Sequence, residues 1–107
     1  APAYAEKFVK IDILDTYTNV LDKGYRSIDM LKKVADKSYF ENDFETSAKY
    51  YGELITLDPQ IETVYYYRYA ESLKAINQID KANEAMLLFE SKNTANDITR
   101  HSKVARN

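Results

Sequence analysis

Hydrophobic residues recur along the chain at intervals of three and four, the spacing that places them on one face of an α-helix. Two stretches show this pattern clearly. In the first stretch, the face is formed by Leu31, Val34, Ala35 and Ser38. In the second stretch, it is formed by Tyr66, Tyr69, Ala70 and Leu73. Each stretch predicts an amphipathic helix that packs this face against the rest of the protein, so we expect an all-α fold.

The two predicted helices belong to segments 28–59 and 63–94, which match each other at an offset of 35 residues. Related residue types recur at the matched positions. The pairs are Val34 with Tyr69, Ala35 with Ala70, Asn42 with Asn77, Phe44 with Ile79, Ser47 with Ala82, Tyr51 with Met86 and Leu54 with Phe89. A unit of about 34 residues that forms a helix, a turn and a second helix is a known structural repeat. The match therefore predicts two successive helical hairpins.

Each hairpin needs a tight turn, and an asparagine lies in both of the predicted turns, Asn42 in the first and Asn77 in the second. Asparagine tolerates the left-handed backbone conformation that ends a helix without glycine. Second helices are then expected over about residues 44–57 and about residues 79–91. Pro59 lacks an N–H group and stops the first of these, and Thr63 is expected to cap the helix that follows.

A further apolar stripe precedes the first hairpin. It consists of Ile11, Leu14, Tyr17, Val20 and Leu21. Gly24 is expected to end this helix, and Ser27 to cap the next one. The stripe predicts the second helix of an incomplete leading repeat over residues 4–27. Tyr4 and Phe8 belong either to the first helix of that repeat or to one continuous helix.

The segment after the second hairpin, residues 94–107, is polar apart from two apolar positions. We expect a short capping helix there, with its outer face in water and its last residues frayed.

Small residues at matched positions are expected to let the paired helices approach closely, because each one receives a bulky side chain from the opposite helix. Ala35 is predicted to face Ser47 in the first hairpin, and Ala70 to face Ala82 in the second. All four positions are therefore predicted to be buried.

The pattern resembles the tetratricopeptide (TPR) repeat family over about residues 8–93. Signature positions are occupied by Leu31, Val34, Ala35, Phe44, Ser47, Tyr51, Leu54 and Pro59. The chain departs from the family at Ser38, where an aromatic is usual, at Asn42 and Asn77, where glycine is usual, and in the lack of a proline that closes the second repeat. The resemblance implies a TPR-like α-solenoid of antiparallel helix hairpins in a single domain over residues 1–107. Its parts are a leading partial repeat (4–27), two full repeats (28–60 and 63–93) and a C-terminal cap or tail (94–107).

A narrower resemblance involves three motifs. These are Thr16-Tyr17 with the run from Val20 to Ser27, Tyr50-Tyr51-Gly52-Glu53-Leu54, and the run from Tyr65 to Ala75. They are similar to the N-terminal TPR region of OmpA-family envelope proteins of Bacteroidetes, some of them associated with type IX secretion and gliding. The resemblance implies a periplasmic, outer-membrane-associated scaffold for secretion or envelope proteins. In that family peptidoglycan is bound by a separate OmpA-like domain, so we expect no peptidoglycan-binding residues in these 107 residues.

Stacked helical hairpins curve, and their first helices line the concave side, where partner peptides usually bind. The candidate protein-binding residues are therefore those that lie off the core stripe of the predicted first helices. They are Lys32, Asp36, Tyr39, Tyr67, Arg68, Glu71 and Lys74. An aromatic side chain beside an arginine is a combination enriched at binding hot spots. The alternative interpretation is a solvated helix face with no partner.

Composition argues against other functions. With 15 basic and 17 acidic residues, the net charge of −2 lacks the basic surplus that nucleic acids attract. The chain contains no cysteine, one histidine and two glycines, which excludes thiol chemistry, a histidine-pair metal site and a glycine-rich phosphate loop. No apolar run reaches the length of about 18 residues that spans a membrane. We therefore expect no enzyme activity, cofactor, metal or membrane insertion.

The sequence thus predicts a protein-protein interaction scaffold. Two alternatives remain open at this point: a structural spacer between domains with no ligand of its own, and a cytoplasmic TPR adaptor.

Overall fold

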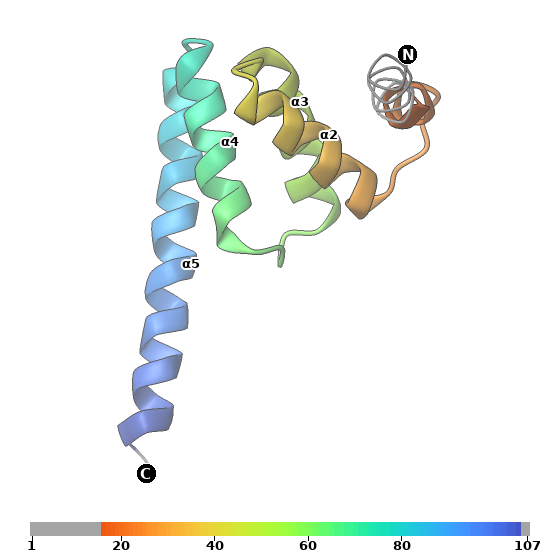
Figure 1. Cartoon of the computed structure of the whole chain (residues 1–107). Coiled ribbons are helices and arrows are strands. Elements are labelled where there is room, and N and C mark those ends of the chain that lie inside the picture. Colours follow the sequence, from red (N-terminus) through yellow and green to blue (C-terminus); the bar gives the residue numbers. More distant parts are fainter. Residues whose placement is uncertain (1–15, 106–107) are drawn as a thin grey trace, which may run out of the picture.

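Four α-helices make up most of this protein in a computed structural model that describes residues 16–105, with side chains described as far as residue 95 (Figure 1). The helices are α2 (Ile28–Phe40), α3 (Phe44–Leu57), α4 (Thr63–Ala75) and α5 (Ile79–Ala105). A shorter helical segment, residues 16–22, precedes them, and no strand occurs among the described residues. The all-α prediction is confirmed. Residues 4–15 of the predicted leading repeat lie outside the described residues.

The 35-residue recurrence extends to the helix boundaries. Both ends of α4, and the beginning of α5, lie 35 residues after the matching points of α2 and α3. The turns match as well, since Asn42 has a φ of 65° and Asn77 a φ of 66°. Their left-handed backbone lets the next amide turn back to the helix: Asp43 N donates to Ser38 O at 2.8 Å, and Gln78 N donates to Leu73 O at 2.9 Å. The prediction that asparagine adopts the left-handed conformation in both turns is confirmed.

Of the two predicted helix caps, one is confirmed and one is wrong. The Ser27 side chain accepts a hydrogen bond from Met30 N at 3.4 Å and caps α2, as predicted. The prediction for Thr63 is wrong, because Thr63 is the first residue of α4 and Glu62 holds the cap position without a side-chain cap bond. The Glu62 carboxylate instead pairs with Lys32 Nζ on α2 at 3.5 Å.

Each helix packs against its neighbours in sequence: α2 on α3, α3 on α4 and α4 on α5. The short Asn-centred turns make α2 and α3 run in opposite directions, and α4 and α5 do the same (Figure 1). All four small residues predicted at the helix contacts are buried, with exposed fractions of 0% for Ala35 and Ser47, 2% for Ala70 and 6% for Ala82. Ala70 and Ala82 belong to the same apolar cluster between α4 and α5. Ser47 also touches α4, because its hydroxyl lies 2.6 Å from the Ser72 hydroxyl.

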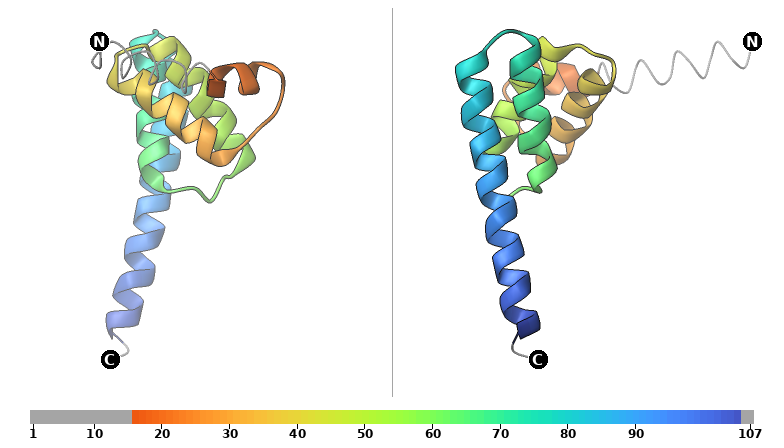
Figure 2. Two further views of the ribbon diagram at one scale, coloured as in Figure 1. Left: turned by 45° about the vertical axis from the view of Figure 1, so that its right-hand side comes forward. Right: turned by 90° about the vertical axis from the view of Figure 1, so that its left-hand side faces the viewer.

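The last helix is longer than predicted. A second helix ending near Ser91, followed by a separate short capping helix over residues 94–107, was expected; instead α5 is continuous from Ile79 to Ala105. Neither glycine nor proline occurs in this stretch, so nothing in the backbone interrupts the helix. Its C-terminal part extends beyond the other helices (Figures 1 and 2).

Candidate binding surface

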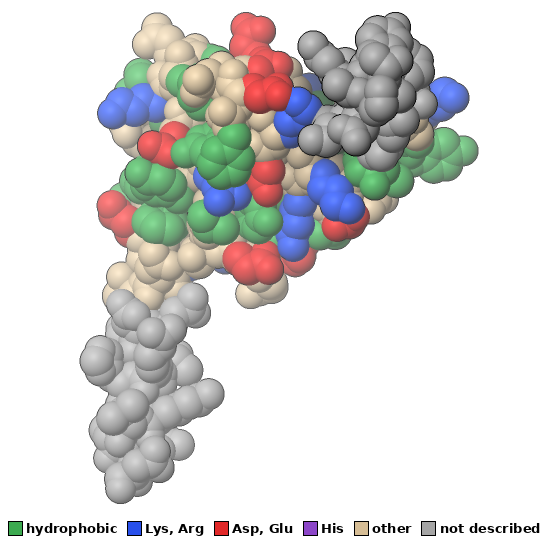
Figure 3. Space-filling view, in the orientation of Figure 1, with side chains coloured by type: hydrophobic (Ala, Val, Ile, Leu, Met, Phe, Trp, Pro, Cys, Tyr) green, Lys and Arg blue, Asp and Glu red, His purple; other side chains and the backbone are tan. Residues whose placement is uncertain are grey.

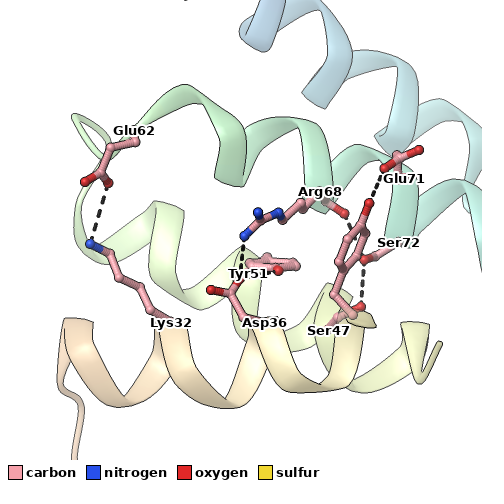
Figure 4. Close-up of polar contacts among 9 residues, drawn as sticks. Lys32, Asp36, Ser47, Tyr51, Glu62, Arg68, Glu71 and Ser72 are labelled. Atoms are coloured by element: carbon pink, nitrogen blue, oxygen red, sulfur yellow. Dashed lines mark hydrogen bonds and ion pairs between the residues drawn. The ribbon is translucent and has the colours of Figure 1, made fainter. Parts of the chain in front are cut away.

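The predicted binding residues lie on α2 and α4, which face each other through their side chains (Figure 4). Three polar contacts connect α2 with α4 or with Glu62, the residue directly before α4. Arg68 Nη1 lies 2.9 Å from Asp36 Oδ1, the Tyr39 hydroxyl donates to Glu71 Oε1, and Lys32 Nζ lies 3.5 Å from Glu62 Oε2. The structure thus brings five of the seven predicted residues together, but largely as partners of one another. We call these contacts the α2–α4 polar network.

Asp36 is the centre of this network. Its Oδ1 atom accepts hydrogen bonds from Arg68 and, at 2.6 Å, from the hydroxyl of Tyr51 on α3. Burial raises the pKa of Tyr51, and its hydrogen bond to Asp36 raises it further. Partial burial alone lowers the pKa of Arg68, but the charge of Asp36 and the contacts with Tyr51 outweigh it, so this pKa is raised. Both donors therefore keep their protons, and three helices are tied to one carboxylate.

Sequence reasoning placed Tyr51 at a TPR signature position and missed its polar role. The ring is fully buried. A buried tyrosine hydroxyl usually needs a hydrogen-bond partner, and this was the available signal for such a role.

Arg68 is also surrounded by aromatic rings. Its guanidinium carbon lies 5.0 Å from the centre of the Phe40 ring and 5.7 Å from those of Tyr39 and Tyr65. Such cation–π contacts hold a guanidinium in place. Phe40 itself is 66% exposed, although phenylalanine is usually buried. Phe40 and Arg68 form what we call the Phe40–Arg68 surface, and sequence reasoning missed Phe40. Its position off the core stripe, at the last residue of α2, was the available signal.

The Tyr39–Glu71 contact lies at the edge of the same surface. Burial raises the pKa of Tyr39 to about 12, and the hydrogen bond to Glu71 contributes in the same direction. The phenol is therefore a neutral donor at any physiological pH. It fixes the Glu71 side chain on α4 against α2.

Tyr67 and Lys74, the two remaining predicted residues, form none of the three contacts of the network. The Tyr67 ring is 39% exposed, and its centre lies 5.4 Å from that of Phe89. Lys74 is exposed near the end of α4. With Glu71, both line a hollow of about 300 Å³ between α4 and α5. The seven predicted residues therefore divide between two surfaces. Hydrophobic side chains, mixed with acidic and basic ones, gather over α2, α4 and α5 on the face shown in Figure 3.

A larger hollow, of about 760 Å³, lies between α3 and the start of α5 and was not predicted. Gly52 forms part of its lining, and a Cβ atom there would lie 3.3 Å from the Tyr69 hydroxyl. Glu53 pairs with Arg26 at 3.2 Å through Oε1, while its Oε2 atom is buried without a hydrogen-bond partner. A glycine in the middle of a helix, where it costs stability, was the sequence signal for this close approach.

The described residues contain no group of three or more His, Cys, Asp or Glu side chains placed to hold a metal ion. Nor does any helix among them have the length and apolar character needed to cross a membrane. Comparison with protein-family models, with curated proteins and with solved structures finds no match.

Proposed function

We propose that this protein is a protein-protein interaction scaffold built as a TPR-like solenoid, and that α2 and α4 present its binding surface. Two features support the solenoid: the recurrence of helix bounds at 35 residues and the packing of each helix on its neighbours in sequence. Repeated hairpins of this kind create extended surfaces on which peptides and helices bind.

The Phe40–Arg68 surface is the observation that carries the proposal. Phe40 exposes two-thirds of its surface directly beside an arginine that is already held by Asp36 and by three rings. Binding hot spots are enriched in aromatic residues and arginine. A side chain that is held in place before binding also loses less entropy when a partner arrives.

We further propose, from the resemblance of the three tyrosine-containing motifs, that this scaffold is the periplasmic TPR module of an OmpA-like outer-membrane or peptidoglycan-associated protein. Its partners would be secretion or envelope proteins, and peptidoglycan would be bound only by a separate domain. A cytoplasmic TPR adaptor is the alternative, with the same binding surface and a different set of partners.

A structural spacer is the second candidate function, and one observation favours it. Asp36, Tyr39 and Glu71 already use one another as hydrogen-bond partners, so the α2–α4 polar network stabilises the protein without a ligand. The 27-residue α5 helix, which extends beyond the other helices, is also suited to holding two domains apart.

A test of the proposal compares Phe40→Ala with Leu87→Ala, because both side chains are 66% exposed and lie on different helices. Each variant would be used to capture proteins from a bacterial envelope extract, and the affinity for a captured partner would then be measured. Phe40→Ala should weaken the affinity about tenfold, as expected for a hot-spot aromatic, and Leu87→Ala should leave it unchanged.

Equal retention of every partner by the two variants would remove the Phe40–Arg68 surface as the binding site. Capture of no partner at all by the intact protein would favour the spacer. Charge reversal of Arg68 is a poorer test, since it breaks the bond to Asp36 and would lower stability as well as binding.

A further inference from the structure

The side of α4 and α5 that faces away from α2 and α3 is not covered by any described element. The right-hand view of Figure 2 looks onto this side, where α4 and α5 lie in front and the other helices lie behind them. A hollow of about 300 Å³ lies between α4 and α5. We call the eight residues that line it the end face. They are Tyr67, Ala70, Glu71, Lys74, Ile79, Ala82, Asn83 and Met86.

The 35-residue recurrence relates the end face to the surface of the first hairpin on which α4 packs. We call that surface the seat of α4. The matched residues, each 35 positions earlier, are Lys32, Ala35, Asp36, Tyr39, Phe44, Ser47, Ala48 and Tyr51. Several of these hold α4 directly. Asp36 binds Arg68, Tyr39 donates to Glu71, and Ser47 bonds to Ser72. The second hairpin therefore repeats a helix-binding seat, and among the described residues that seat is vacant.

From this equivalence we propose that the end face binds an amphipathic helix of another protein. The helix carries an arginine or lysine that pairs with Glu71. It carries an aliphatic side chain four residues later that packs on Ala82 and Met86. The proposal rests on the scaffold function proposed above, but it concerns a different surface.

The partner helix needs a basic residue because the acidic position of the seat, Asp36, is also acidic in the end face. Glu71 takes the place of Asp36, which receives the guanidinium of Arg68 at 2.9 Å in the first hairpin. Glu71 Oε1 accepts the bond from Tyr39, and a carboxylate has a second oxygen that can accept two donors from a guanidinium. Arginine fits this position better than lysine because its fork of donors matches a carboxylate.

The aliphatic residue is required because the floor of the seat has lost its polar groups. Ala82 replaces Ser47, and Met86 replaces Tyr51. A hydroxyl in the position of Ser72, four residues after Arg68, would therefore have no partner here and would be costly to bury. Methionine adapts its shape to different apolar side chains, which suits a bound leucine, isoleucine or methionine.

A second copy of this chain is the less suitable occupant. The helix that fits such a seat, α4, has its Arg68 and Ser72 side chains already bonded to Asp36 and Ser47 of the same molecule. A second copy would have to break those bonds before offering the helix. A helix of another protein carries no such cost.

The test uses a stapled helical peptide with the sequence of residues 63–75 and the change Ser72→Leu, titrated into the full chain and followed by calorimetry. Saturable binding of one peptide per chain is expected. Glu71→Gln keeps an acceptor for Tyr39 but removes the charge, so it should weaken binding about tenfold. Glu84→Gln is the matched control, since it removes an exposed acid of α5 outside the end face, and it should change nothing.

A peptide with Arg68→Gln should bind the intact chain as weakly as the original peptide binds Glu71→Gln, and the two changes together should cause little further loss. Additive losses, or equal effects of Glu71→Gln and Glu84→Gln, would overturn the pairing. The absence of saturable binding would overturn the site. A dimer of the chain that Glu71→Gln weakens would show that a second copy occupies the end face.

The Phe40→Ala variant separates this inference from the proposed function. It should bind the peptide normally, because Phe40 lies on α2 and outside the end face. If Phe40→Ala loses its captured partner and keeps the peptide, both proposals stand. If it keeps both, only the Phe40–Arg68 surface fails.

Discussion

At the scale of single residues, several side chains that the sequence predicts as a binding site stabilise the fold by bonding to one another. Asp36 and Arg68 were predicted as groove residues because they lie off the apolar stripe of their helices. In the structure they join each other and Tyr51, while Phe40 remains open to a partner. Spacing along one helix shows that a residue lies outside the core. It does not show which side chain of another helix lies opposite.

The different contributions of two cross-helix ion pairs can be measured. Asp36→Ala leaves the Tyr51 hydroxyl and Arg68 without their acceptor in a partly buried site, and should lower the free energy of unfolding by about 1 to 2 kcal/mol. Lys32→Ala removes a pair whose glutamate, Glu62, is 66% exposed and should leave the free energy of unfolding nearly unchanged, because exposed ion pairs contribute little. Urea denaturation followed by circular dichroism gives both values. An equal cost for the two variants would contradict the central role of Asp36.

At the scale of secondary-structure elements, helix starts and ends were predictable where one residue type decides the backbone. Asn42, Asn77 and Gly24 all have positive φ, as their positions in the pattern indicated. The end of α5 was not predictable in this way. Polarity after residue 93 suggested a new element, but helix formation depends on backbone propensity, and no residue there opposes it.

The turn between α4 and α5 gives a direct test of this backbone role. Asn77→Ala places a Cβ in a left-handed conformation without the side chain that makes asparagine tolerant of it, and should lower the free energy of unfolding by about 1 kcal/mol. Asn77→Gly should have little effect or stabilise slightly, because glycine adopts this conformation freely.

Asn83→Ala is the control for this test, because Asn83 is an exposed residue inside α5. It should stabilise slightly, since alanine is the better helix former. Thermal melting of the three variants orders them. A result in which Asn77→Ala is as stable as Asn77→Gly would show that the turn does not constrain the fold.

At the scale of the whole molecule, the core is divided into two apolar clusters. One lies mainly between α2, α3 and α4, and the other lies mainly between α4 and α5. The Tyr69 ring packs against both clusters and so connects them. Tyrosines take a large part in this interior, which makes the fold sensitive to phenol ionisation.

Alkaline pH should therefore unfold the protein cooperatively. Burial raises the pKa of Tyr39 from its ordinary value of 10.0 to about 12 and also raises the pKa values of Tyr51, Tyr65 and Tyr69. Because the folded state favours the neutral phenols, their stabilising effect is complete below pH 10. It decreases as the pH rises from 10 toward 12.

A pH titration followed by circular dichroism and by tyrosinate absorbance tests this expectation. The ionisation of the buried tyrosines should coincide with the loss of helix. Tyr39→Phe, which has no phenol to ionise at this position, should make the loss of stability with pH less steep. Full ionisation of all the tyrosines while the helices remain intact would contradict the expectation.

The sequence by itself determined the helices apart from the end of α5, the 35-residue recurrence, the asparagine turns and the burial of Ala35, Ser47, Ala70 and Ala82, because each follows from local backbone preference or from periodicity along one chain. Tertiary structure alone decided that Asp36 serves Tyr51 and Arg68, that Phe40 is left exposed beside Arg68, and that no described element covers the end face. These features depend on how far one helix is shifted along its axis and rotated relative to the helix that it packs against. Side chains far apart in the sequence set that geometry together, and no stretch of sequence contains it.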